Sequence, residues 1–194
     1  MNILKRMNLP NRLTLLRVAM VPVFCAFAGV PETWAQIAAA CVFVLASLTD
    51  TLDGRIARRR GLITDFGKLM DPIADKLLVT AAMVFLTSQQ RMSAWACTLF
   101  VGREFVVSGF RLVAAARNVV IAAGKLGKYK TAAQMVAVVL SLLCVPLDGA
   151  GAAIAWRPLE IAAHAIMYAA LALSILSGAE YIKKNAGVID TRDI

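Results

Sequence analysis

Charged residues are scarce in this sequence of 194 residues: they make up 17% of the chain, whereas 60% of it is hydrophobic. A soluble domain is usually nearer to about 45–50% apolar, so this composition excludes an ordinary soluble fold. The mean hydropathy of +0.71 points the same way. We therefore predict an all-α integral membrane protein, built as a single domain over residues 1–194.

Acidic residues are the scarcer of the two charge types. The chain has 12 Asp and Glu against 21 Lys and Arg, which gives a formal net charge of +9. In a membrane protein such an excess indicates the bias of basic residues toward the cytoplasmic side rather than a nucleic-acid partner. We therefore expect the lipid bilayer, and no nucleic acid, as the surroundings of this chain.

Cysteine and histidine are too few and too scattered for a zinc site or a disulfide framework. The four cysteines fall in four different apolar stretches without CxxC spacing, so we expect them to act as small hydrophobic residues. His164 stands alone in an apolar segment and is expected to pack rather than to catalyse. The sequence also lacks an internal repeat, which leaves an inverted-repeat transporter without support.

Apolar segments alternate with short polar ones in a pattern that predicts six transmembrane helices, each long enough for a hydrocarbon core of about 30 Å. Before them, residues 1–12 predict a short interfacial helix, with a frayed basic tail as the alternative. A secretory signal is the other interpretation of the first thirty residues, but the spans that follow favour a first transmembrane helix. The predicted spans are residues 13–29, 33–59, 64–88, 92–116, 129–147 and 158–183, with a loop at 148–157.

The basic residues predict how the helices are oriented. Two of the 21, Arg91 and Arg157, fall at the end that holds the predicted loops near residues 30, 90 and 150. The others fall at the opposite end, which also holds both termini, so that end is expected to face the cytoplasm. The three tryptophans fall near the non-cytoplasmic ends, as an interfacial aromatic belt should.

Four aspartates interrupt the apolar pattern within residues 50–75: Asp50, Asp53, Asp71 and Asp75. Each pair has helical spacing, i,i+3 or i,i+4, and so shares one helix face. The predicted turn is centred near residue 62, so in an antiparallel hairpin the four carboxylates would lie at similar heights and form one ring. A charge at bilayer depth costs about 2.5–3.5 kcal/mol or more, so this cluster needs a counter-charge.

A bound cation is the simplest counter-charge for four neighbouring carboxylates. Lys68 and Lys76 are alternatives for two of them. Ligand sets made only of carboxylates suit Mg²⁺ or Mn²⁺ rather than zinc, and four carboxylates are enough for two ions, which in turn bring phosphate. A cation transporter, which would also place carboxylates inside a bundle and would show ion flux, is the competing hypothesis.

The same stretch carries a longer pattern, DxxDG-xx-AR-x8-G-xxx-D-xxx-D, formed by Asp50, Asp53, Gly54, Ala57, Arg58, Gly67, Asp71 and Asp75. It resembles the signature of the CDP-alcohol phosphatidyltransferases, membrane enzymes that join an alcohol to a group from a CDP-linked donor and release CMP. The resemblance implies that the four aspartates bind two Mg²⁺ or Mn²⁺ ions and that Asp75 is also the general base. It further implies that the CDP moiety contacts Gly54, Arg58, Thr64 and Gly67.

Three further segments, residues 8–17, 102–111 and 127–134, resemble one bacterial branch of this family, in which glycerol 3-phosphate attacks CDP-diacylglycerol. That resemblance places Asn11 and Thr14 near the nucleotide. It also implies a homodimer in the bacterial cytoplasmic membrane, with the active site facing the cytoplasm. A cardiolipin synthase of the same family, with phosphatidylglycerol as acceptor, is the alternative.

Basic residues of the fourth and fifth predicted spans favour a small phosphorylated acceptor. Arg103 and Arg111 are two helical turns apart and so share a face, and guanidinium groups bind phosphate in a bidentate manner. Lys128 and Lys130 follow at the start of the fifth span. We predict that these four residues bind the acceptor phosphate. The alternatives are pairing of an arginine with Glu104 or lipid phosphate, and lysines that reach to the membrane surface.

Overall fold

The structure, a computed structural model, describes residues 9–60, 65–117, 119, 121, 124–149 and 153–188. In this part of the chain every regular element is a helix, as predicted. The elements are α2 (Leu9–Ala28), α3 (Thr33–Arg60), α4 (Asp65–Ser88), α5 (Ala94–Ala116), α6 (Lys125–Gly149), α7 (Ala153–Asn185) and the short 3₁₀ helix η1 (Ala186–Val188).

The observed helices follow the six predicted segments, with corrections at four boundaries. One is the start of α6, which lies at Lys125 rather than at the predicted residue 129. The predicted loop over 148–157 is wrong, because α6 continues to Gly149 and α7 already begins at Ala153. Pro158 therefore lies inside α7, as Pro22 and Pro146 lie inside α2 and α6. Apolar helices tolerate such prolines because neighbouring groups satisfy the freed carbonyls. At the start of the chain, α2 begins at Leu9, so residues 9–12 belong to the first long helix; residues 1–8 of the predicted interfacial helix lie outside the described residues.

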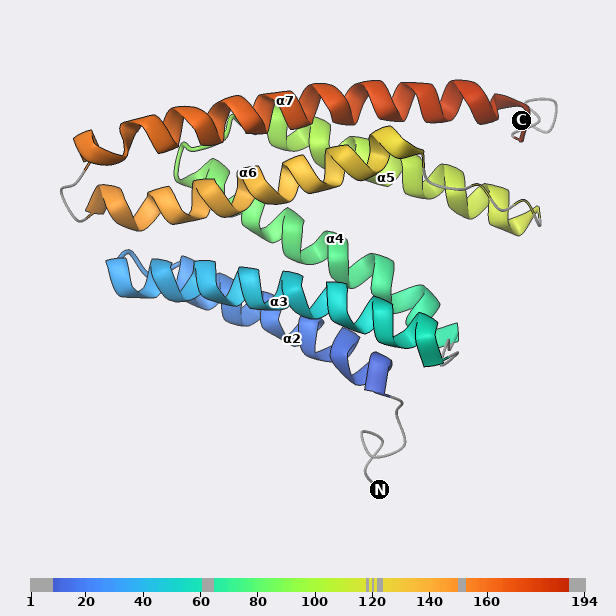
Figure 1. The fold of residues 1–194 in the computed structure, drawn as a ribbon, viewed down its shortest axis with the longest axis horizontal. Coiled ribbons are helices and arrows are strands. Elements are labelled where there is room, and N and C mark those ends of the chain that lie inside the picture. Colours follow the sequence, from blue (N-terminus) through green and yellow to red (C-terminus); the bar gives the residue numbers. More distant parts are fainter. Residues whose placement is uncertain are drawn as a thin grey trace.

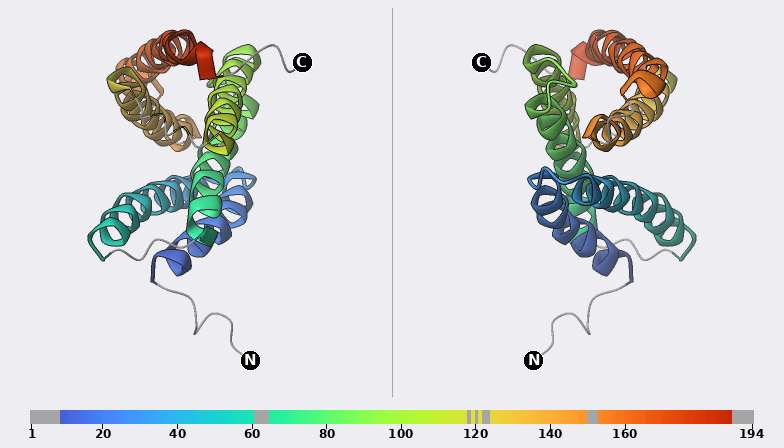
Figure 2. Two further views of the ribbon diagram at one scale, coloured as in Figure 1. Left: turned by 90° about the vertical axis from the view of Figure 1, so that its right-hand side faces the viewer. Right: turned by 90° about the vertical axis from the view of Figure 1, so that its left-hand side faces the viewer.

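Consecutive helices run back and forth along the length of the molecule (Figure 1). Two pairs pack side by side: α2 with α3, and α6 with α7. Between these pairs lies α4, which contacts α2, α6 and α5, while α5 packs against α7 (Figure 2). The first and last helical pairs are thus joined through α4 and through contacts of α3 with α6.

The buried core includes residues of all six long helices, and its aromatic part lies where α2, α3 and α4 meet. The ring of Phe24 lies 6.2 Å from that of Phe43 and 6.1 Å from that of Phe85, in tilted and edge-to-face arrangements. On α3 a row of small residues, including Ala35 and Ala39, is fully buried. Small side chains let helices approach closely, which is how membrane helices gain packing energy.

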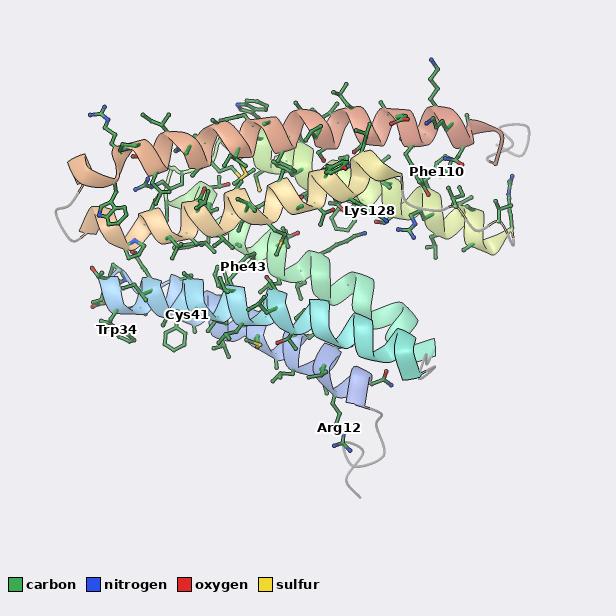
Figure 3. The ribbon with its side chains drawn as sticks, in the orientation of Figure 1. Arg12, Trp34, Cys41, Phe43, Phe110 and Lys128 are labelled. Carbon is green, nitrogen blue, oxygen red and sulfur yellow. The ribbon has the colours of Figure 1, made fainter. Side chains whose placement is uncertain are left out.

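Among the residues that the structure describes, three helices are long and apolar enough to cross a membrane, over Asn11–Ala28, Leu126–Pro146 and Trp156–Asn185. Two shorter apolar segments, Thr33–Thr49 and Lys76–Ser88, lie on α3 and α4. The three tryptophans are exposed near the beginnings of α3, α5 and α7. Figure 3 shows Trp34 at one end of the bundle and Arg12 toward the other. The long apolar helices therefore indicate a membrane protein.

Replacing Phe24 with alanine should destabilise the bundle more than replacing Phe105. Phe24 is fully buried, whereas Phe105 on α5 is 68% exposed. Core Phe→Ala changes cost about 3–5 kcal/mol in soluble proteins. In lipid only the packing share of that cost remains, because transfer between apolar surroundings contributes little. Thermal unfolding in detergent micelles measures the difference, and equal midpoints for the two variants would contradict this core.

Candidate functional site

The four predicted metal ligands lie on two helices, one pair on each, as the sequence predicts. Asp50 and Asp53 belong to the last three turns of α3, and Asp71 and Asp75 to the first three turns of α4. The helical backbone supports a shared face for each pair. Their side chains lie outside the described residues, as do those of four predicted CDP-binding residues, Gly54, Arg58, Thr64 and Gly67.

The two acidic helices do not form the close hairpin that the sequence predicts. They run in opposite directions, but contact one another at few points, and their ribbons diverge toward the connected ends (Figure 2). Instead, α2 packs against both α3 and α4. A third helix therefore contributes to the walls of the acidic region.

One face of α2 is polar and buried. Asn11 and Thr14, both predicted to lie near the nucleotide, are 8% and 1% exposed, and Arg17 is 1% exposed. Their spacing of three residues places them on one side of the helix, and the buried side of α2 packs against α3 and α4. Arg17 was not among the predicted site residues. The sequence pattern that indicates Arg17 is its position three residues after Thr14, which repeats the spacing between Asn11 and Thr14.

A second polar cluster is centred on Glu104 of α5. Its Oε1 accepts a hydrogen bond from Nη1 of Arg103 at 3.1 Å and another from Nζ of Lys130 on α6. The Lys130 side chain is only 4% exposed, and its ammonium group lies 6.0 Å from the centre of the Phe100 ring. One carboxylate oxygen therefore holds two cations together in a poorly hydrated region, where a charge without a partner would be costly.

The cluster reaches α4 through a hydroxyl group. Lys76 donates a hydrogen bond from Nζ to Oγ of Ser108, and Ser108 donates one to the backbone oxygen of Glu104 at 2.6 Å. Lys76 directly follows Asp75 in the chain. Through Lys76 and Ser108, helix α4 is thus linked to the Glu104 cluster on α5 and α6.

The structure separates the four predicted acceptor residues into two groups. Arg103 and Lys130 are brought together by Glu104. Arg111 and Lys128 are exposed, and neither takes part in the contacts described for this cluster. Pairing of Arg103 with Glu104, one of the alternatives in the sequence, is therefore observed.

A cavity of about 400 Å³ lies away from both clusters, where α4 ends and α5 begins. It is lined by Thr87, Gln90, Arg91, Met92, Ser93, Ala94, His164 and Tyr168, and the guanidinium of Arg91 pairs nearby with Glu160 at 2.8 Å. None of the predicted site residues lines it.

Among the side chains that the structure describes, no group of three His, Cys, Asp or Glu is arranged to hold a metal ion. The side chains of the four aspartates are not among those described.

Arg17→Ala should lower the melting temperature of the purified protein far more than Arg12→Ala. Both residues are arginines of α2, but Arg17 is buried and Arg12 is exposed. Truncation of a large buried side chain leaves a cavity, which costs about 2–5 kcal/mol in soluble cores, and Arg17 would also lose the polar or packing interactions that it makes. Thermal unfolding in detergent tests this, and similar melting temperatures for both variants would argue against a buried charge that stabilises this face of α2.

Comparison with known proteins covers nearly the whole chain. The sequence model of the CDP-alcohol phosphatidyltransferase family matches residues 7–176. Two similar proteins are named CDP-diacylglycerol–glycerol-3-phosphate 3-phosphatidyltransferase. The one from Bacillus subtilis is 39% identical over 95% of this chain and 98% of its own length, and the one from Escherichia coli is 36% identical over 90% and 93%.

A third relative, from Mycobacterium tuberculosis, is named a probable phosphatidylglycerophosphate synthase. It is 39% identical over 91% of this chain and 81% of its own length. The family match spans both the acidic helices and the Glu104 cluster. The chain belongs to the CDP-alcohol phosphatidyltransferase family.

Proposed function

We infer that this protein transfers the phosphatidyl group from CDP-diacylglycerol to sn-glycerol 3-phosphate, which gives phosphatidylglycerophosphate and CMP. The observation that carries this inference is the identity of 36–40% to relatives named for this reaction, over nine-tenths of the chain or more. The Glu104 cluster supports the choice of acceptor. It holds two cations where the predicted fourth and fifth spans meet, and a phosphate ester needs such groups.

Enzymes of this family use divalent metal ions. The donor set of this chain fits them, because four carboxylates at helical spacing on α3 and α4 suit hard cations such as Mg²⁺ or Mn²⁺. We propose that Asp50, Asp53, Asp71 and Asp75 hold two such ions. When bound, these ions would neutralise the diphosphate of the donor and the charge that develops on the leaving phosphate.

The residues of the chain then divide the remaining work. Asp75 accepts the proton of the attacking glycerol hydroxyl, whose oxygen forms a bond to the phosphorus that carries the diacylglycerol. The bond from that phosphorus to the oxygen of CMP breaks, and CMP leaves with the electron pair. Asn11 and Thr14 on α2, with Gly54, Arg58, Thr64 and Gly67, orient the CDP moiety.

On the acceptor side, Arg103 and Lys130 bind the phosphate of glycerol 3-phosphate. Arg111 and Lys128, which are exposed, add positive charge that attracts the anion. The electrostatic field of such positive charges raises the rate at which an anionic substrate reaches its site. A phosphatidylglycerol acceptor, as in a cardiolipin synthase, is the second candidate, and the assay below distinguishes the two.

We further propose that all six long helices, α2 to α7, cross the bacterial cytoplasmic membrane as one domain over residues 1–194. The distribution of the 21 basic residues supports an active site that faces the cytoplasm. The protein acts as a homodimer in this proposal, which carries over a property of the family.

Purified protein should release CMP from CDP-diacylglycerol when Mg²⁺ or Mn²⁺ and glycerol 3-phosphate are present. Removal of the metal with a chelator should abolish release, because the diphosphate would lose its counter-charge. Inositol phosphate, serine and phosphatidylglycerol are the comparison acceptors, and CMP is measured by chromatography. Release with phosphatidylglycerol alone would favour the cardiolipin synthase. If the folded protein releases no CMP with any of these acceptors but carries ions across vesicle membranes, the result would favour the transporter.

Asp75→Asn should abolish turnover while nucleotide binding stays largely intact. The amide keeps an oxygen ligand and the shape of the side chain, but it cannot take the proton. Turnover is followed by CMP release and binding by calorimetry with a CDP nucleotide in the presence of metal. If binding and turnover disappear together, the main role of Asp75 is to hold metal.

A further inference from the structure

The last long helix, α7, contacts the side chain of Arg103 at three points. Nε of Arg103 donates a hydrogen bond to the backbone oxygen of Ser174 at 3.0 Å, and Nη2 donates one to Oγ of Ser177 at 2.9 Å. The third point is Gly178. A Cβ atom there would lie 3.2 Å from Cγ and 3.3 Å from Nε of Arg103. We name Ser174, Ser177 and Gly178 the α7 notch.

The notch is buried and specific for this side chain. Ser174, Ser177 and Gly178 are all buried in the structure. A backbone oxygen and a hydroxyl at a spacing of three residues present two acceptors on one face of the helix, and the missing side chain of Gly178 leaves room for the arginine stem. Lysine, with a single point of charge and no planar fork, could not use both acceptors in this way.

The anchored guanidinium keeps donors for a ligand. Arginine has five N–H donors. The contacts with Ser174, Ser177 and Glu104 use one hydrogen each on Nε, Nη2 and Nη1. One hydrogen on each terminal nitrogen remains, which is the number needed for a bidentate contact with a phosphate group. The side chain is 15% exposed, so these donors are not sealed in the core.

We propose that Ser177 and Gly178 are positioning residues for the acceptor phosphate: the α7 notch fixes Arg103 so that its two remaining donors face the phosphate of the acceptor. This proposal deepens the proposed function and rests on its assignment of Arg103 to the acceptor. Fixing a side chain before binding removes the entropy cost of ordering it later. The substrate class is therefore a phosphate monoester held by a preorganised guanidinium group.

Two variants test the proposal by steady-state kinetics of CMP release. Ser177→Ala removes one anchor, and Gly178→Ala forces the arginine stem to shift by a few tenths of an ångström. Each should raise the KM for glycerol 3-phosphate about threefold to tenfold, because lost hydrogen bonds and small displacements of a binding group weaken contacts of this kind. The KM for CDP-diacylglycerol should stay within about twofold of wild type, since the notch does not contact the donor side in this proposal.

Gly109→Ala is the matched control for Gly178→Ala. It makes the same change on α5, where an added Cβ would meet nothing within 4 Å. Gly109 also lies on the same helix face as Phe105 and Leu112, which are 68% and 73% exposed. Both KM values of this variant should equal those of wild type.

A double-mutant cycle with Arg103→Ala separates positioning from a general role in stability. In the Arg103→Ala background the notch holds nothing, so Ser177→Ala and Gly178→Ala should raise the KM for glycerol 3-phosphate no further. Full additivity in the cycle, or an unchanged KM in both single variants, would overturn the proposal while leaving the proposed reaction intact. An unchanged KM in Arg103→Ala itself would remove Arg103 from the acceptor site and overturn both assignments.

Discussion

The hydrogen bonds of one carboxylate oxygen, Oε1 of Glu104, tie together the half of the bundle that lies beyond α4. Through this atom α5 is joined to α6 at Lys130, and Arg103 continues the connection to α7. Such a contact is worth little on a wet surface, but it becomes a strict requirement where neither charge is well hydrated. The packing of α5 and α7 therefore follows the geometry of a polar cluster as much as that of apolar surfaces.

The remaining half of the bundle repeats this arrangement with different residues. The buried polar residues Asn11, Thr14 and Arg17 lie on α2, which packs against both of the helices that carry the aspartates. Apolar packing among Phe24, Phe43 and Phe85 continues from this region toward the far end. Each half therefore has a polar end and an apolar end, and Lys76 on α4 connects the two polar ends through Ser108.

Much of the fold could be predicted from the sequence, because a bilayer allows few alternatives to long helices. The boundaries of α3 and α4 were expected within one residue, whereas Pro158 misled the boundary of α7, since membrane helices tolerate proline. For the site, helical spacing correctly placed each aspartate pair on one helix. It could not show that α2 packs against both acidic helices, or that α7 holds Arg103, because contacts between helices distant in sequence leave no periodic signal. The partly buried Glu104 was expected only as an alternative partner of an arginine.

The order in which this chain is made has a bearing on α5. This helix carries Arg103 and Glu104 near its middle, and a translocon that tested it alone would meet a penalty of about 2.5–3.5 kcal/mol for a central arginine. The groups that offset this cost, Lys130 and Ser177, are synthesised later, on α6 and α7. In the proposal that all six long helices cross the membrane, α5 gains these partners only after α6 and α7 have been made. A chain that stops before α7 would keep the contact of Glu104 with Lys130 but would leave the Arg103 guanidinium without its two acceptors on Ser174 and Ser177.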